Sequence, residues 1–258
     1  MFGEHKVAVV VPAHNEAEFI GRVVGTMPIF VDRIYVVDDA STDGTGAAAS
    51  TAGDPRTRIL KHESNRGVGG AILSGYRAAI EDGTDFVAVM AGDGQMDPAD
   101  LESLLGPLEQ GEADYVKGNR LGWPGARQLM PWTRFVGNHV YSWLSRRLCG
   151  YPELRDSQCG YTAIRSSFFS RLDPSGIYPR YGFPNDLLSR LACLEARLIQ
   201  VPVRPIYGNE KSGISLFTAL VRMPLVLLSC HLRIRRFRRG QSLAARVTVP
   251  SLAQVDRS

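Results

Sequence analysis

The chain has only four cysteines, and their spacing gives no sign of a metal or disulfide framework. Cys149, Cys159, Cys193 and Cys230 are far apart and include no C-x-x-C pair. Neither a zinc site nor a set of disulfides is therefore expected. Free thiols of this kind are typical of a protein in the reducing cytosol.

Long apolar runs are also missing. Residues 7–11 form an apolar run that is too short for a signal peptide and leads straight into a polar turn. The C-terminal run, residues 216–232, is interrupted by Arg222 and Pro224, which makes it marginal for spanning a bilayer. We expect an amphipathic, membrane-associating helix within residues 216–240. A helix that packs on the core is the alternative.

Acidic residues are scarce at the C-terminal end. Residues 222–258 hold eight arginines and one acid, Asp256, which gives +7 and leaves −3 for the rest of the chain. Arginines crowd residues 233–239, and such clusters favour anionic lipid headgroups. A solvated basic tail is the alternative, and nucleic acid is not an expected partner because no recognisable binding module is present. Residues 241–258 are expected to be a disordered tail.

Strand-like and helix-like segments alternate along the first 215 residues. The expected strands are residues 7–11, 33–37, 59–61, 86–90, 113–117 and 199–204. Helical patterns follow most of them, and 258 residues are enough for one large domain. The sequence therefore predicts an α/β fold with a mostly parallel sheet flanked by helices. Ligands of such sheets bind at the carboxyl ends of the strands.

The most informative strand is residues 86–90, because side chains that can bind a metal ion follow it directly. Asp93 and Gln95 offer hard oxygen ligands on alternate positions, which suits Mg²⁺ or Mn²⁺ bridging a diphosphate. A turn aspartate at the end of a strand is the alternative for Asp93. Asp97 precedes Pro98 and is expected to cap a helix.

Two further strand ends carry polar or glycine-rich loops. Asp39, just after the second strand, is expected to contact a base or ribose. The turn at residues 65–70 is rich in glycine and could hold a phosphate on backbone amides, including that of Gly69. It has neither the dinucleotide spacing nor a P-loop lysine, so this signal is weak by itself.

Three motifs in order carry a family resemblance. They are V-P-A-H-N-E at 11–16, V-D-D-A-S-T-D-G-T at 37–45 and G-D-G-Q-M-D-P at 92–98. Together they resemble the GT-A-fold family 2 glycosyltransferases, and most closely the dolichyl- or polyprenyl-phosphate mannosyltransferase branch. The resemblance covers about residues 6–215. One position departs from it, since Ala91 stands where the family usually has the first aspartate of Asp-x-Asp, and this change favours a weaker metal site, another metal preference or lost activity.

The resemblance implies roles for particular residues. Those expected to line the nucleotide pocket are Pro12, His14 and Glu16. Asp39 would contact the base or ribose, and Asp93 with Gln95 would hold the metal. In the polar loop at 207–215, Lys211 and Ser212 are expected to contact the diphosphate when the loop closes.

On the acceptor side, the resemblance assigns a lipid phosphate to Arg120 and Arg134. Guanidinium groups suit a phosphate dianion, although surface arginines are the alternative. Asp186 is expected to act as a base or to contact the sugar, unless it is only a carboxylate at the start of a helix.

The expected function is an inverting hexosyltransferase. It would move mannose or glucose from GDP-mannose or UDP-glucose to a polyprenyl or dolichyl phosphate, as a peripheral protein on the cytoplasmic face of the membrane. A lipid phosphate is already ionised, so no strong base is needed. A sugar-hydroxyl acceptor, with Asp186 as base, and a non-catalytic sugar-nucleotide-binding protein are the alternatives. The expected units are residues 1–215, the glycosyltransferase domain, 216–240, the membrane-associating segment, and 241–258, the tail.

Overall fold

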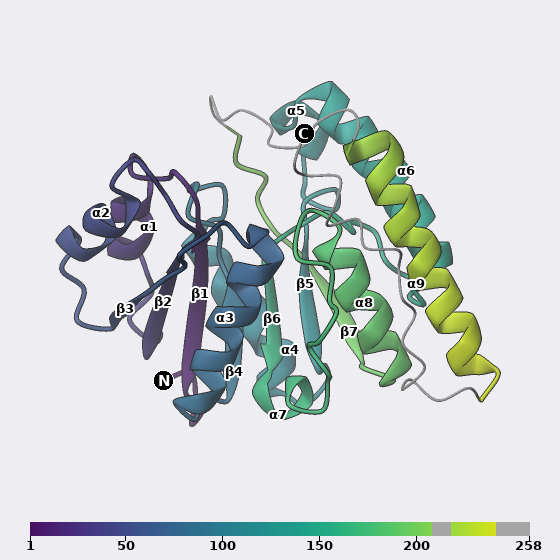
Figure 1. Cartoon of the computed structure of the whole chain (residues 1–258), viewed down its shortest axis with the longest axis horizontal. Coiled ribbons are helices and arrows are strands. Elements are labelled where there is room, and N and C mark those ends of the chain that lie inside the picture. The colour runs from purple at the N-terminus through teal and green to yellow at the C-terminus, as the bar shows by residue number, and fades with distance from the viewer. Residues whose placement is uncertain (208–217, 241–258) are drawn as a thin grey trace.

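Figure 1 shows a computed structural model that describes residues 1–207 and 218–240. In these residues seven strands form one sheet, in the order β3-β2-β1-β4-β6-β5-β7. Their bounds are β1 Val7–Ala13, β2 Arg33–Asp38, β3 Thr57–Lys61, β4 Phe86–Val89, β5 Tyr115–Asn119, β6 Thr162–Arg165 and β7 Leu198–Pro202. Strand β6 runs antiparallel to β4 and β5, and the other pairs are parallel. The mostly parallel sheet is confirmed.

Helices cover both faces of this sheet (Figure 1). Their bounds are α1 Ile20–Gly25, α2 Thr45–Thr51, α3 Gly67–Glu81, α4 Leu101–Glu109, α5 Ala126–Leu129, α6 Trp132–Leu148, α7 Ser166–Phe169, α8 Phe183–Cys193 and α9 Met223–Arg238, with short turns η1 Pro98–Asp100 and η2 Thr218–Arg222. One core cluster joins the sheet to α3, α8 and α9, and the other joins it to α1, α2 and α4. The flanking helices are thus confirmed.

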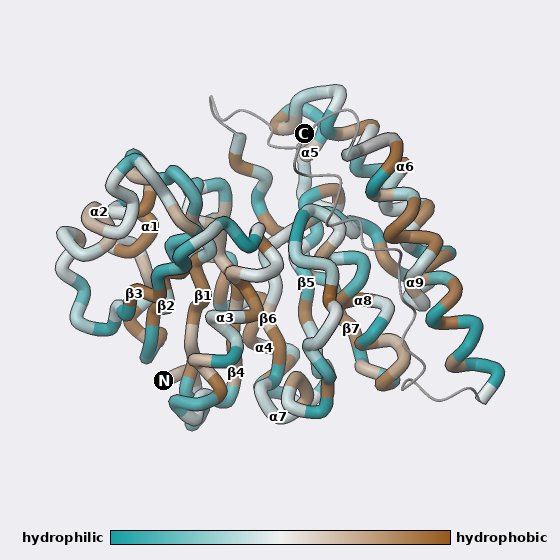
Figure 2. The backbone as a smooth tube through the Cα atoms, in the orientation of Figure 1, coloured by the Kyte–Doolittle hydropathy of each residue, from teal (hydrophilic) through white to brown (hydrophobic). Residues whose placement is uncertain are grey.

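Strand β1 shows why its sequence is apolar at every position. Val10 lies in the core cluster beneath α3, whereas its neighbours Val9 and Val11 lie in the opposite one. A strand buried on both faces has no solvent side, so the usual alternation of polar and apolar residues disappears. Helix α3 comes very close, because a Cβ on Gly75 would lie 2.2 Å from a Val10 methyl carbon. Figure 2 shows the apolar strands between more polar loops.

Two elements differ from the expectation. Strand β6 was not predicted, because its four residues carry no periodic pattern and its pairing with β4 and β5 is decided by distant parts of the chain. Helix α3 begins at Gly67 rather than near residue 71. The carboxylate of Asp39 accepts hydrogen bonds from the backbone amides of Arg66 and Gly67. The start of α3 is therefore capped by the residue that follows strand β2. The expected Asp97 cap is confirmed, with its Oδ1 3.0 Å from the Ala99 amide nitrogen.

The C-terminal helix lies within the expected segment 216–240. One side of α9 packs into the core through Met223, Val226, Leu227, Cys230 and Ile234. In the described part of the chain, no helix has the length and apolar character needed to cross a membrane. The alternative, a helix that packs on the core, is therefore correct for one face of α9. The boundary at residue 215 and the tail at 241–258 fall outside the described residues and stay predictions.

Candidate active site

A cavity of about 280 Å³ lies where β1, β2 and β4 end. Its lining residues are Pro12, Ala13, His14, Glu16, Asp39, Asn65, Gly67, Val68, Ala71, Ala91, Gly92, Asp93, Arg180 and Tyr181. Five of the predicted site residues are in this set, although they come from three separate motifs. Parallel strands bring their carboxyl ends to one edge of the sheet, which explains why the motifs meet.

Asp39 holds the wall of this cavity together. Its Oδ1 lies 2.6 Å from His62 Nδ1 and accepts the Arg66 amide at 2.8 Å, while its Oδ2 accepts the Gly67 amide at 2.8 Å. The Asp39 carbonyl lies 2.8 Å from His14 Nδ1. The carboxylate is only 4% exposed and both oxygens have partners in the protein. Asp39 therefore positions the turn before α3, and its predicted contact with a base or ribose stays a prediction.

The predicted metal ligands lie on two sides of one turn. Asp93 lines the large cavity, whereas Gln95 lines a smaller one next to it. The backbone amide of Gln95 donates to Asp93 Oδ1 at 3.0 Å, which fixes the turn. Ala91 lines the large cavity without offering an oxygen. No cluster of three acidic, histidine or cysteine side chains able to hold a metal exists in the described residues.

The smaller cavity, of about 30 Å³, has a basic lining. The residues around it are Gln95, Met96, Arg120, Cys159, Gly160, Tyr161, Val203, Arg204, Ile206 and Tyr207. Arg120 Nη1 donates to the Tyr207 hydroxyl at 3.3 Å, and the Arg134 guanidinium lies 5.1 Å from the centre of the same ring. Burial raises the pKa of Tyr207, so its phenol is neutral at physiological pH. The structure thus brings the two predicted arginines together around a tyrosine.

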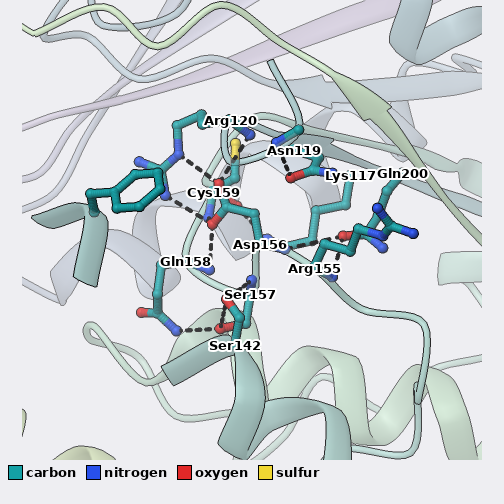
Figure 3. A network of polar contacts seen from close by, with 12 residues as sticks. Lys117, Asn119, Arg120, Ser142, Arg155, Asp156, Ser157, Gln158, Cys159 and Gln200 are labelled. Carbon is teal, nitrogen blue, oxygen red and sulfur yellow. Dashed lines mark hydrogen bonds and ion pairs between the residues drawn. The ribbon is translucent and has the colours of Figure 1, made fainter. Parts of the chain in front are cut away.

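Arg120 is anchored by a buried carboxylate (Figure 3). Asp156 is fully buried and accepts hydrogen bonds from Arg120 Nε at 2.8 Å and Nη2 at 3.0 Å. Burial alone would raise the pKa of Asp156, but the charge of Arg120, its hydrogen bonds and the charge of Lys117 together outweigh burial and lower that pKa. Lys117, also fully buried, donates to the Cys159 carbonyl. Burial lowers the pKa of Lys117.

Two predicted site residues do not fit their expected roles. The Gly69 amide already donates to the Pro179 carbonyl at 2.7 Å, and a Cβ at Gly69 would lie 2.5 Å from the Phe183 ring. Gly69 therefore allows close packing and does not offer its amide to a phosphate. Asp186 is buried beneath α9, where its Oδ1 accepts from Arg233 at 2.6 Å, and it lines neither cavity. Its carboxylate links helices α8 and α9, and its expected catalytic role stays a prediction.

Other lining residues were missed or cannot be placed. Arg180 and Tyr181 line the large cavity from the loop before α8, and Tyr207 joins the arginines. Tyr181 precedes Gly182 and Phe183, a sequence signal that could have pointed to it, whereas nothing in the sequence pointed to Arg180. Lys211 and Ser212 lie outside the described residues.

Comparisons with known proteins agree with this geometry. The sequence profile described as "Glycosyl transferase family 2" matches residues 8–173. An undecaprenyl-phosphate mannosyltransferase of Micrococcus luteus is 32% identical over 81% of this chain and 88% of its own length. A polyprenol monophosphomannose synthase of Mycolicibacterium smegmatis is 29% identical over 84% of this chain and 85% of its own.

A solved structure shares the fold. The glucosyl-3-phosphoglycerate synthase of Mycobacterium tuberculosis, in complex with Mn²⁺, uridine diphosphate and glucosyl-3-phosphoglycerate, has a TM-score of 0.64 and 23% identity, covering 88% of this chain and 80% of that one. At this identity the likeness supports the GT-A fold alone. The family profile spans well over half of the chain and includes the strand-end motifs that form the large cavity. The chain therefore belongs to glycosyl transferase family 2 and is a hexosyltransferase that uses a nucleotide sugar.

Proposed function

We propose that this hexosyltransferase moves a hexose, with inversion, from GDP-mannose or UDP-glucose to a polyprenyl or dolichyl phosphate at the cytoplasmic face of a membrane. The observation that carries the proposal is a pair of neighbouring cavities. The larger one is lined by the nucleotide motifs, and the smaller one contains Arg120 and Arg204 but no carboxylate among its described lining residues. Asp93 and Gln95 belong to the turn between them.

The basic lining of the smaller cavity favours a phosphate as the acceptor group. A guanidinium pair suits a phosphate dianion, which is already ionised at neutral pH and can attack without a general base. No carboxylate lines this cavity in the described residues, and Asp186 is buried elsewhere. A sugar hydroxyl would need such a base, so the alternative acceptor has less support.

A divalent metal fits only in part. Asp93 supplies one carboxylate and Gln95 one amide oxygen, both hard ligands suited to Mg²⁺ or Mn²⁺. Since Ala91 adds none, most of the coordination would have to come from the donor diphosphate and water. When bound, the metal would stabilise the charge of the leaving diphosphate. The Mn²⁺ in the fold relative is consistent with this arrangement.

An exposed apolar face on α6 and α9 supports membrane association. The two helices contact each other at one edge of the molecule (Figure 1). On α6 the exposed residues are Trp132, Val136, Val140 and Trp143, and on η2 and α9 they are Val221, Leu225, Leu228 and Leu232. Both sets follow helical spacing, so each forms a stripe that faces outward. We call these eight residues the α6–α9 face.

The charges near the α6–α9 face favour an anionic surface. The chain has no acidic residue between Asp114 and Glu153, and none from Lys211 to Val255. Trp143 lies beneath the guanidinium of Arg147, 3.9 Å from the ring centre, an aromatic and cationic pair that suits the boundary between lipid and water. The arginine-rich end of α9 is hydrophilic in Figure 2. These features would hold a peripheral protein next to its lipid acceptor.

The names of the relatives support the same acceptor class. The two bacterial relatives are named for undecaprenyl phosphate and for polyprenol monophosphomannose. Each alignment covers more than four fifths of this chain. Arg120 and Arg134 lie near the middle of the chain and therefore within the aligned length. Mannose is therefore the first sugar to test.

The test is transfer of labelled sugar from GDP-mannose and from UDP-glucose to farnesyl phosphate, with Mg²⁺ or Mn²⁺. We expect product from one donor, and a loss of at least about 100-fold in Asp93→Asn, because a ligand of the leaving diphosphate is removed. Asp97→Asn is the matched control, since asparagine can also cap η1 and activity should be kept.

Each other outcome points elsewhere. Transfer to a glycolipid hydroxyl but not to farnesyl phosphate would replace the acceptor. Nucleotide binding without transfer to either acceptor would indicate a protein that binds without catalysing, which is the other class that Ala91 suggests.

A further inference from the structure

The structure contains two arginine–aspartate pairs with the same geometry. Arg120 donates from its backbone amide and Nε to Asp156 Oδ2, at 3.1 and 2.8 Å, and from Nη2 to Oδ1 at 3.0 Å. Arg197 makes the same three bonds to Asp114, at 3.0, 3.0 and 2.9 Å. The two pairs lie beyond opposite ends of β5.

The two pairs differ in what the remaining nitrogen meets. Arg197 Nη1 donates to the Gly111 carbonyl at 2.6 Å, so this arginine is bonded to the protein on both edges. Arg120 Nη1 instead meets the Tyr207 hydroxyl at 3.3 Å, inside the small cavity. The Arg120 side chain is 19% exposed, against 57% for Arg197. Arg120 is thus buried on its Asp156 side and presents its other edge to the cavity.

Asp156 is held rigidly enough to fix an arginine. Its Oδ1 also accepts the amides of Gln158 at 3.2 Å and Cys159 at 3.0 Å. The preceding backbone is bonded to β7, where Gln200 Oε1 accepts the amides of Arg155 and Asp156 at 2.8 and 3.2 Å. With so many fixed partners, rotation of Asp156 would break several buried hydrogen bonds at once. Figure 3 shows these contacts converging on Asp156.

The net charge of Arg120, Asp156 and Arg134 is positive. Asp156 is fully buried and offsets one positive charge, that of Arg120. Arg134 adds a second guanidinium through its contact with Tyr207. Asp156 therefore orients Arg120 without cancelling the attraction of the cavity for an anion.

We propose that Asp156 is a positioning residue for the acceptor phosphate: it binds the Nε and Nη2 edge of Arg120 so that Nη1 faces the phosphate in the small cavity. This inference rests on the proposed function, because it takes a phosphate as the acceptor group. The phosphate contact of Arg120 is then made by one fixed nitrogen. The Nε and Nη2 groups of Arg120, which together could have donated two hydrogen bonds to a phosphate, donate to Asp156 instead.

The experiment is a double-mutant cycle on sugar transfer to farnesyl phosphate, with Arg120→Gln, Asp156→Asn and the double variant. We expect each single change to lower kcat/KM for farnesyl phosphate by about 30-fold or more, and the double to be within about 3-fold of the worse single. In Asp156→Asn the loss should include a raised KM for farnesyl phosphate, because Arg120 binds that phosphate and loses its orientation. The KM for the nucleotide sugar should stay within about 2-fold of wild type.

Asp114→Asn is the matched control, since it breaks the equivalent pair at the far end of β5 and should leave kcat/KM within about 2-fold. If Asp156→Asn does not fold, Arg120→Lys tests the same orientation, because lysine keeps the charge but lacks the fork. Losses that multiply in the double variant, or an Arg120→Lys enzyme with near wild-type activity, would overturn the inference.

The inference and the proposed function can fail separately. A wild-type enzyme that transfers sugar to farnesyl phosphate, with multiplicative losses in the cycle, would keep the function and reject the role of Asp156. A wild-type protein that binds farnesyl phosphate but not farnesol, with affinity lost in Arg120→Gln and Asp156→Asn yet without transfer, would keep the role and reject the function. No binding and no transfer would reject both.

Discussion

Ala91 decides how many oxygen ligands the large cavity offers. It lines that cavity two residues before Asp93, and its methyl group cannot bind a cation. Hard divalent cations bind more tightly as the number of carboxylate ligands rises. A metal in this protein would therefore depend strongly on the bound nucleotide for its remaining ligands.

Restoring a carboxylate at this position should strengthen the metal site. In Ala91→Asp we expect half-maximal activation of transfer at a metal concentration at least about 10-fold lower than in wild type, because one charged ligand is added. Ala91→Asn, which adds a side chain of similar size without the charge, is the control and should shift it much less. The measurement is a titration of transfer with Mn²⁺ and with Mg²⁺. An unchanged midpoint in Ala91→Asp would show that this position does not face the metal.

At the level of single residues, the kind of chemistry was predictable but the partners were not. Asp39, Asp93 and Arg120 were chosen by their types and their places after strands, and all three line a cavity. The sequence did not reveal that the carboxylate of Asp39 is taken by His62 and two amides. It also did not reveal that Asp156 holds the fork of Arg120. Those partners are 23 or more residues away along the chain, so local patterns carry no record of them.

At the level of elements, Asp186 joins helices α8 and α9. It lies in the first turn of α8 and accepts from Arg233 of α9 at 2.6 Å, with Arg190 of its own helix 3.5 Å away. The backbone amide of Tyr178 also donates to it at 2.8 Å. Two cations and an amide therefore converge on one buried carboxylate, which makes it a structural centre for the helices that cover this part of the sheet.

Removing this charge should cost stability and leave the chemistry intact. Asp186→Asn leaves a buried amide between two partly buried arginines that lose its charge, so we expect the free energy of unfolding to fall by about 3–5 kcal/mol. Asp173→Asn, a change at an exposed carboxylate, should cost less than about 1 kcal/mol. Urea unfolding measures both, and kcat of the folded Asp186→Asn protein should stay within about 3-fold of wild type. If the folded variant loses 100-fold or more in kcat, Asp186 takes part in catalysis, as expected of a general base.

The same scale shows why some elements were easier to predict than others. Strands β1 and β4 are fully buried apolar runs and were predicted with small errors at their ends. Strand β6 has four residues, and helix α3 starts at a cap supplied by Asp39. Pairing partners and caps from distant segments decide such cases, whereas burial on both faces is written directly into the composition of a strand.

At the level of the whole molecule, the exposed apolar residues of the α6–α9 face support the proposed membrane association. Its stripes come from helices about 90 residues apart in sequence that contact each other in the fold. A polyprenyl phosphate is confined to a bilayer, so a transferase for it benefits from docking there. The proposed acceptor and this surface therefore support each other.

Charged substitutions on this face should weaken membrane binding. In Val140→Glu combined with Leu228→Glu we expect binding to vesicles that contain anionic lipid to fall at least about 10-fold, because two apolar contacts of about 1.5–3 kcal/mol each are lost. Ile29→Glu is the control, since Ile29 is 95% exposed and belongs to the loop between α1 and β2. Co-sedimentation with vesicles measures the effect. Equal binding of the double variant and the control would mean that this face does not dock.

The sequence by itself determined the α/β class, the order of most strands and helices, and the chemical type of the residues at the strand ends. These features depend on local composition, since a buried strand must be apolar and a strand-end loop shows its polar residues directly. It also indicated the basic C-terminal segment, because charge is a property of composition.

Only the tertiary structure decided which of these groups act together. It placed Asp93 and Arg120 at neighbouring cavities, bonded the Gly69 amide and the Asp186 carboxylate to groups within the protein, and brought α6 into contact with α9. Whether a polar group faces a cavity or is bonded within the protein depends on residues that are distant in sequence. The physical reason is that a donor or acceptor satisfies its hydrogen bonds in three dimensions, while the sequence records only its identity.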